Sequence, residues 1–232
     1  MTTIQTNLQA VQARIAAACR AAGRNPASVR LLAVSKTWPA GAVAEVAAAG
    51  QLAFGENYVQ EGVAKAEGLA SLGLEWHFIG PLQSNKTRPV AAHFLWVHSV
   101  DRLKIAQRLS EQRDVHLPPL NICLQVNVSG EESKSGVSPE ALPALALAVA
   151  RLPRLALRGL MGIPEPTPDQ ALLHHRFARL RQLRDGLVAQ GLALDTLSMG
   201  MSDDLEVAIA EGATMVRVGT AIFGRRPPLS QP

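Results

Sequence analysis

The feature that most constrains the fold is a regular alternation of short apolar segments with longer segments of helical periodicity. Apolar runs of strand length recur eight times, and helix signals separate them with little linker. The predicted strands are Val29–Lys36, Leu52–Phe54, Trp76–Ile79, Leu95–Val100, Leu120–Val128, Leu155–Met161, Leu192–Met199 and Thr214–Val218. Strands that alternate with helices favour a parallel sheet, and eight of them favour closure into a (β/α)8 barrel. An open, doubly wound sheet is the alternative.

Helix boundaries follow the usual start and stop signals. Gly23 closes a first amphipathic helix and Pro39 marks the start of the next. Asp101 is expected to cap the helix after the fourth strand, and Ser138 to open the helix after the fifth. Because the linkers are short, residues 1–232 are expected to form a single domain, with a frayed proline-rich tail at 225–232.

Composition limits the kinds of partner. The 232 residues are 47% hydrophobic, which can fill a sizeable core, but only 4% aromatic. The net charge of +4 is not concentrated in a Lys/Arg cluster, whereas a nucleic-acid site needs a basic stripe with stacking aromatics. We therefore expect no nucleic-acid partner. The chain is also expected to be a monomer.

The cysteines and the N-terminus indicate the compartment. Cys19 and Cys123 fall within apolar patterns and are expected to be buried free thiols, which suits a reducing environment. The segment that starts at Met1 has no basic stretch followed by an apolar run, and no uncharged apolar run reaches membrane-spanning length. A cytoplasmic protein without a membrane partner is expected.

Lys36 is the first candidate for chemistry, because an apolar strand pattern stops on it. Desolvation at the mouth of a barrel favours the neutral amine, which can attack a carbonyl and form an imine. An exposed lysine that only ends a strand is the alternative interpretation.

Candidate phosphate-binding residues follow the last two predicted strands. Ser202 is predicted to start a helix, so that its hydroxyl and nearby N–H groups face an anion. Gly219 permits a close backbone approach, and Thr220 adds a hydroxyl donor. In a closed barrel the first and eighth strands are neighbours, which places Lys36 and Gly219 at the same mouth. An ordinary helix cap and an ordinary turn are the alternatives.

Arg217 and Asn57 complete the candidate site. Arg217 shares a strand face with Gly219, and a guanidinium that points into a barrel mouth needs an acceptor, such as a ring nitrogen or a phosphate. Pairing with a carboxylate, either Asp195 or Asp203, is the alternative. Asn57 follows the second strand and can contact a ring substituent or simply cap a helix.

Histidines and one further lysine are weaker candidates. His77 and His98 lie in the third and fourth strands, where they are expected to be satisfied core histidines or interior donors. His174 and His175 are adjacent on a helix and face different ways, so no metal site is expected. Lys134, in the polar loop after the fifth strand, is a candidate second amine or a solvated loop lysine.

Six ordered motifs resemble those of a known family. They are Ala33-Val34-Ser35-Lys36, Phe54-Gly55-Glu56-Asn57, His77–Lys86, Gly159-Leu160-Met161, Ser198–Ser202 and Arg217–Gly224. In these motifs, and over essentially its whole length, the chain resembles the YggS/PROSC family of pyridoxal phosphate homeostasis proteins. The resemblance implies a barrel like the N-terminal domain of alanine racemase, with pyridoxal 5′-phosphate (PLP) bound as an imine.

The resemblance also implies a role for each candidate. The implied cofactor-binding residues are Lys36, Asn57, Ser202, Arg217, Gly219 and Thr220. Of these, Lys36 forms the imine, Arg217 faces the pyridine nitrogen, Asn57 lies by the ring, and the other three hold the phosphate. The family is not known for robust catalysis; its implied role is to buffer PLP and deliver it, with apo PLP enzymes as recipients.

A PLP-dependent amino-acid racemase on the same barrel is the main alternative function. Racemisation needs a second base opposite the lysine, and racemases of this fold resemble a barrel with an added β-domain that supplies a tyrosine. Here the barrel takes nearly all of the chain, and the only tyrosine is Tyr58. An arginine at the ring nitrogen also weakens the electron sink. A Schiff-base aldolase is a third hypothesis, and it needs no ring-nitrogen partner.

Overall fold

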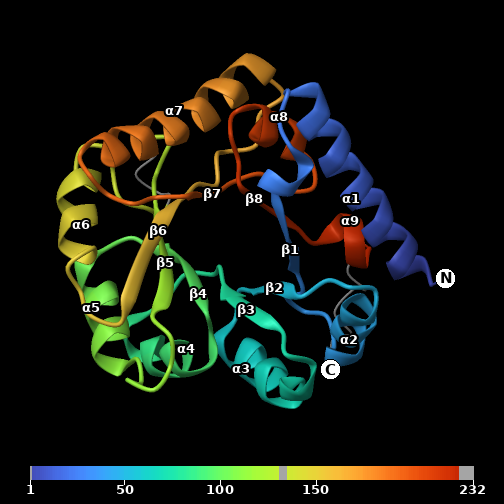
Figure 1. Cartoon of the computed structure of the whole chain (residues 1–232), viewed down its shortest axis with the longest axis horizontal. Coiled ribbons are helices and arrows are strands. Elements are labelled where there is room, and N and C mark those ends of the chain that lie inside the picture. Colours follow the sequence, from blue (N-terminus) through green and yellow to red (C-terminus); the bar gives the residue numbers. More distant parts are fainter. Residues whose placement is uncertain (1, 131–134, 225–232) are drawn as a thin grey trace.

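The computed structural model describes residues 2–130 and 135–224, which form a closed barrel of eight parallel strands surrounded by helices (Figure 1). The predicted barrel is confirmed, and the open sheet is wrong because the first and last strands pair with each other. The expectations for Lys134 and for the tail at 225–232 lie outside the described residues.

The strands are short and follow one another around the barrel in chain order. Their bounds are β1 (Arg30–Val34), β2 (Ala53–Glu56), β3 (Glu75–Phe78), β4 (Trp96–Val100), β5 (Leu120–Gln125), β6 (Leu155–Met161), β7 (Thr196–Ser198) and β8 (Met215–Val218). Ala33 of β1 lies opposite Val218 of β8, which closes the ring. Parallel strands all end at one rim, so the loops after β1, β2, β7 and β8 converge there.

Helices cover the outside of the barrel. Their bounds are α1 (Thr3–Ala21), α2 (Ala40–Ala48), α3 (Val59–Gly68), α4 (Thr87–His93), α5 (Leu103–Gln112), α6 (Leu142–Val149), α7 (Gln170–Ala189), α8 (Leu205–Ala210) and α9 (Thr220–Phe223). The N-terminal helix α1 packs against α8 and α9, beside the end of the described chain (Figure 1).

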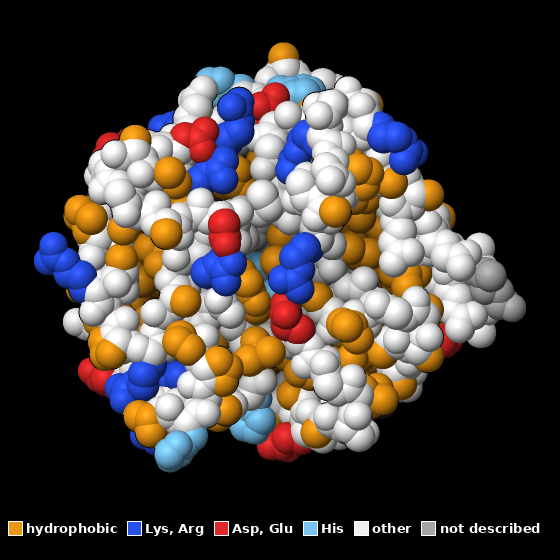
Figure 2. Space-filling model, viewed as in Figure 1, with side chains coloured by type: hydrophobic (Ala, Val, Ile, Leu, Met, Phe, Trp, Pro, Cys, Tyr) orange, Lys and Arg blue, Asp and Glu red, His pale blue; other side chains and the backbone are white. Residues whose placement is uncertain are grey.

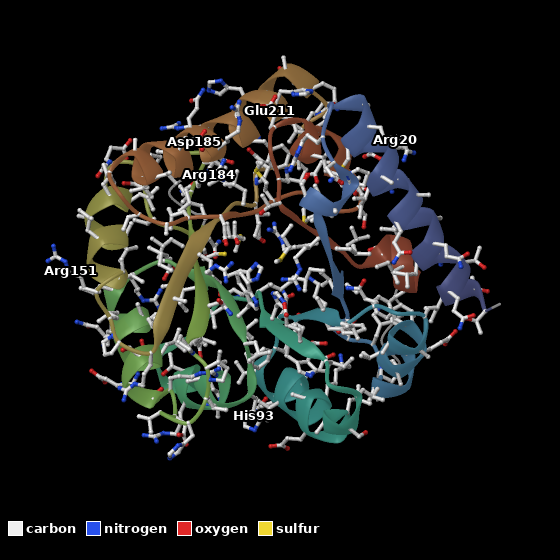
Figure 3. All side chains as sticks on the ribbon, viewed as in Figure 1. Arg20, His93, Arg151, Arg184, Asp185 and Glu211 are labelled. Carbon is white, nitrogen blue, oxygen red and sulfur yellow. The ribbon has the colours of Figure 1, made fainter. Side chains whose placement is uncertain are left out.

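Side chains alternate between two cores along each strand. Outward side chains, such as Trp76 and Phe78 of β3, join the main apolar core between the strands and the helices. Inward side chains fill the space that the strands enclose (Figure 3), where two small apolar clusters form around Leu32 and around Trp96. Cys19 and Cys123 are buried free thiols, as predicted, and burial raises the pKa of Cys123 to about 12.

Several predicted boundaries are corrected. β7 covers only Thr196–Ser198, because the preceding residues form a turn in which Leu194 donates to the carbonyl of Leu192. Asp101 does not cap α5: Arg102 holds the cap position without a side-chain cap bond, and Asp101 pairs with it instead. Ser138 caps a turn ahead of α6 by accepting from the N–H of Ala141.

Two surface features bear on partners. On the face drawn in Figure 2, Lys and Arg side chains are scattered among acidic ones and do not merge into a basic stripe. Within residues 2–130 and 135–224, no helix combines the length and the apolar character needed to cross a bilayer.

Candidate functional site

A cavity of about 240 Å³ opens at the rim where β1, β2, β7 and β8 end. All of the binding residues predicted from the sequence line it. They are Lys36, Asn57, Ser202, Arg217, Gly219 and Thr220. The closed barrel therefore brings together residues from four loops that are far apart in the sequence.

Lys36 lies in the loop after β1, two residues beyond the end of the strand at Val34. The residues on both sides of it are fixed by hydrogen bonds. Ser35 is fully buried, and its hydroxyl donates to the Glu56 carboxylate at 2.6 Å. Thr37 has a φ of 69°, a left-handed conformation that is unusual for a β-branched residue, and its N–H donates to Glu61 at 2.5 Å. The backbone that carries Lys36 is thus held in one conformation.

Lys65 is the centre of this support, and sequence reasoning missed it. Its ammonium group donates to the Ser35 carbonyl and to the carboxylates of Glu56 and Glu61, each at 2.7 Å. Burial raises the pKa of Glu56, while the Lys65 ammonium acts in the opposite direction. The only sequence signal was the i,i+4 spacing of Glu61 and Lys65, which is also common on solvated helix faces.

The second side of the cavity is lined with backbone N–H groups. Ser202 lies in a turn and does not start a helix as predicted, because α8 begins only at Leu205. In the described part of the chain, the N–H groups of Ser202, Gly219 and Thr220 have no hydrogen-bond acceptor. A Cβ on Gly219 would lie 3.0 Å from the Val34 carbonyl oxygen, so the position is too tight for a side chain to be added freely. Free N–H groups beside two hydroxyls suit a phosphate.

Arg14 of α1 supports the Ser202 turn and was also missed. Its guanidinium donates to the Ser202 carbonyl at 3.0 Å and forms an ion pair with Glu206 at 2.9 Å. A trans peptide group holds its carbonyl and its N–H in opposite directions. The contact therefore directs the N–H of Asp203, another cavity-lining residue, away from α1.

Arg217 projects from β8 and is 4% exposed. The predicted alternative of a carboxylate partner is wrong: Asp195 pairs with Arg158, and Arg217 donates to oxygens of Ser198 and Gly162. Burial lowers its pKa to about 10, so the guanidinium remains a cation at neutral pH. A buried cation that borders a cavity favours an anionic or strongly accepting ligand.

Asn57 has an amide oxygen that could accept a hydrogen bond from a ligand. The alternative that it caps a helix is wrong, because α3 begins at Val59 and Tyr58 holds the cap position. Its Oδ1 atom is buried and has no partner among the described residues. A buried amide oxygen without a partner is costly, and a ligand group that donates a hydrogen bond would satisfy it.

The histidines lie away from the cavity. His77 and His98 are fully buried in the barrel interior, as predicted. His174 pairs with Glu211, which Figure 3 places on the outer helices. Among the described residues no group of three or more His, Cys, Asp or Glu side chains could hold a metal ion.

Relatives of known name match almost the whole chain. Residues 6–227 match the family described as alanine racemase, N-terminal domain. A pyridoxal phosphate homeostasis protein of Pseudomonas aeruginosa is 68% identical over 226 residues, which cover 97% of each chain. The protein of the same name from Escherichia coli K12 is 56% identical over 232 residues, covering 97% of this chain and 98% of the relative.

Solved structures of similar fold also match most of the chain. PipY of Synechococcus elongatus PCC7942, solved with PLP bound, is 40% identical, with a TM-score of 0.84 over 96% of this chain and 100% of PipY. Alanine racemase of Corynebacterium glutamicum shares the fold, with 18% identity and a TM-score of 0.66 over 97% of this chain and 63% of the racemase. On these similarities, the chain belongs to the family of pyridoxal phosphate homeostasis proteins, which is built on the fold of the alanine racemase N-terminal domain.

Proposed function

We propose that this chain binds PLP in the cavity between β1, β2, β7 and β8, and that it buffers and delivers the cofactor without robust catalysis. One observation carries the proposal. Lys36 and Arg217 line the same cavity as Ser202, Gly219 and Thr220, whose N–H groups suit a phosphate. The 40% identical relative PipY, solved with PLP bound, supports it.

Each cavity residue has a proposed role. Lys36 would hold the aldehyde carbon of PLP as an imine. Ser202, Gly219 and Thr220 would bind the phosphate, because their N–H groups and hydroxyls need acceptors. PLP supplies an electrophilic carbonyl and an electron-accepting ring when bound.

Two further residues would contact the ring. Arg217 would donate to the pyridine nitrogen, and a guanidinium cannot give up its proton at neutral pH. Asn57 would contact a polar ring substituent, because its buried amide oxygen has no partner in the described part of the chain. An unprotonated ring nitrogen withdraws electrons weakly, which disfavours carbanion chemistry.

The racemase alternative is less well supported by the same cavity. Among the described residues, the ionisable side chains that line it are Lys36, Asp203 and Arg217, and Asp203 adjoins the proposed phosphate loop. Tyr58 is 56% exposed and does not line the cavity; with Lys86 it lines a neighbouring groove that shares Asn57 with the cavity. The racemases among the solved structures are 18% identical or less and show the fold alone.

Several parts of the role remain predictions. We propose that residues 1–232 form one PLP-binding domain, that the chain is a cytoplasmic monomer, and that apo PLP enzymes receive the cofactor. Lys36 would hold PLP through a bond that an incoming amine could replace, with release of the Lys36 amine.

The absorption spectrum of the protein with PLP tests the proposal. Wild type should show the band of a lysine imine, whereas Lys36→Ala should lose the band and still bind PLP more weakly through the phosphate. Each charge-assisted hydrogen bond to the phosphate is worth roughly 1.5–3 kcal/mol. Lys86→Ala, in the neighbouring groove, is the matched control and should keep the band. A wild-type protein without an imine band would contradict the proposal.

A further inference from the structure

A linear hydrogen-bond network crosses the interior of the barrel from Arg217 to Glu75, through Ser198, His98 and His77. Arg217 donates to Ser198 Oγ at 2.8 Å, and Ser198 Oγ lies 2.8 Å from Nδ1 of His98. Nε2 of His98 lies 2.9 Å from Nδ1 of His77, whose Nε2 lies 2.6 Å from the Glu75 carboxylate. Since β4 and β7 are not adjacent, the contact between His98 and Ser198 spans the enclosed space.

The interior of such a barrel is ordinarily filled by branched apolar residues. Here Ser198, His77 and His98 have no exposed surface at all. Two small apolar clusters share the interior with these polar residues, and the Trp96 ring stacks on His77 with centroids 5.3 Å apart and an interplanar angle of 7°. Buried polar groups are costly unless every one of them is satisfied. A buried hydrogen-bond network of this length is therefore expected to have a role in addition to packing.

The Glu75 end of this network determines where its hydrogens lie. An ionised carboxylate can only accept, so His77 donates to Glu75 from Nε2, and a neutral His77 ring then accepts at Nδ1. His98 supplies that hydrogen from its Nε2 atom, which leaves its own Nδ1 atom as an acceptor. The hydroxyl of Ser198 therefore donates to Nδ1 of His98 and accepts from Arg217, which can only donate.

The expected charge states agree with this arrangement. Burial lowers the pKa of both histidines, which favours neutral rings. The hydrogen bond from His77 lowers the pKa of Glu75 to about 2, and Arg30 donates to the same carboxylate oxygen at 2.9 Å. The hydrogen-bond network thus has a cation, Arg217, at the cavity, an anion, Glu75, at the start of β3, and neutral groups between them.

We propose that Arg217 is held in a single orientation by four positioning residues, Ser198, His98, His77 and Glu75. In the network that they form, every hydrogen bond is donated in the direction from Arg217 toward Glu75. Arg217 also donates to the carbonyls of Ser198 and Gly162, at 2.5 and 3.0 Å. These contacts use three of the five N–H groups of a guanidinium. In the part of the chain that the structure describes, the other two N–H groups have no acceptor, which leaves them available to a ligand in the cavity that Arg217 lines. The inference rests on the proposed function only for the identity of that ligand.

The first test needs no ligand. Long-range ¹H–¹⁵N spectra of the labelled wild-type protein at neutral pH distinguish protonated from unprotonated ring nitrogens. His77 and His98, assigned with His77→Gln and His98→Gln, should both be neutral and protonated at Nε2. An imidazolium at either position, or a hydrogen on Nδ1 of His98, would overturn the proposal.

The second test measures the effect on Arg217. Ser198→Ala should weaken PLP binding about fivefold, the effect of one hydrogen bond, and should shift the absorption band of the bound cofactor. Ser198→Thr restores the hydroxyl and should recover both properties. Ser110→Ala is the matched control, since Ser110 is also buried, at 2% exposed, and its hydroxyl donates to the carbonyl of Pro153; it should change neither.

The two tests separate this inference from the proposed function. Wild-type affinity and an unshifted band in Ser198→Ala would overturn the positioning role. Failure of wild type to bind PLP would contradict the proposed function. The ring-nitrogen spectra would still decide whether the hydrogen bonds of the network all point from Arg217 toward Glu75.

Discussion

The ammonium group of Lys65 lies 2.7 Å from the carboxylate of Glu56, and both side chains are almost completely buried. The same ammonium bonds to the carbonyl of Ser35, the residue before Lys36. Its three N–H donors meet three oxygens, so the buried charge is fully satisfied. We infer that this ion pair fixes the backbone from which Lys36 projects.

Replacement of Lys65 tests that support. Lys65→Met leaves the buried Glu56 carboxylate without its cation, and losing one partner of a buried pair costs about 3–5 kcal/mol. The free energy of unfolding in urea should fall by about that amount, and imine formation at Lys36 should weaken. Lys104→Met, at an exposed position of α5, should leave both unchanged. An unfolding free energy within about 0.5 kcal/mol of wild type would show that the pair contributes little.

Arg14 is expected to affect phosphate recognition from outside the cavity. Arg14→Gln removes the contact that orients the Ser202 turn, and affinity for PLP should fall about fivefold, as for the loss of one hydrogen bond. Affinity for pyridoxal, which lacks the phosphate, should not change. Titrations of both compounds check this, with Arg20→Gln as a control on the same helix (Figure 3). Equal weakening for pyridoxal and PLP would assign Arg14 a purely structural role.

Glu75 should make stability depend on acid pH. Its pKa is lowered from 4.5 to about 2, chiefly by the hydrogen bond from His77. A carboxyl with a lowered pKa in the folded protein stabilises it above the unfolded value, and this contribution is lost as pH falls from about 4.5 toward 2. One pKa unit corresponds to about 1.4 kcal/mol, so the loss is roughly 3 kcal/mol.

Unfolding curves of wild type and Glu75→Gln measure this contribution. The difference in unfolding free energy between the two proteins should shrink over that pH range, since all other carboxyl groups are shared. A difference that stays constant with pH would show that Glu75 titrates normally in the folded protein.

The closed barrel follows directly from the sequence. Apolar runs such as Leu120–Gln125 and Leu155–Met161 sit between helical segments, and eight of them leave few other architectures. Closure then brings Lys36 and Gly219 to one rim, which is why a list of loop residues could predict a shared cavity.

The supporting residues could not be predicted in the same way. Lys65 and Ser35, or His98 and Ser198, are distant in sequence, and only the pairing of strands and the packing of α3 bring them together. The sequence predicts that Ser202 starts a helix, but the structure forms a turn there, in which the Asp204 side chain accepts from the N–H of Met201.

Turnover distinguishes a cofactor carrier from a racemase. Saturated with PLP, the protein should racemise alanine or serine negligibly compared with a true racemase, because Arg217 in its proposed position would keep the ring a weak electron sink. Arg217→Glu supplies an acidic partner but should still not create a fast racemase, since racemisation needs a second base and no tyrosine of the described residues lines the cavity. Chiral chromatography of the reaction checks this. Robust turnover in wild type that is abolished by Lys36→Ala would favour the racemase.

The central claim is that Lys36 holds the cofactor. Borohydride reduction of the PLP-loaded protein, followed by digestion and mass spectrometry, locates the lysine that carries the adduct. We predict that the modification lies on the peptide containing Lys36, at close to one cofactor per chain. An adduct found mainly on Lys65, Lys86 or Lys134, with Lys36 unmodified, would contradict the account.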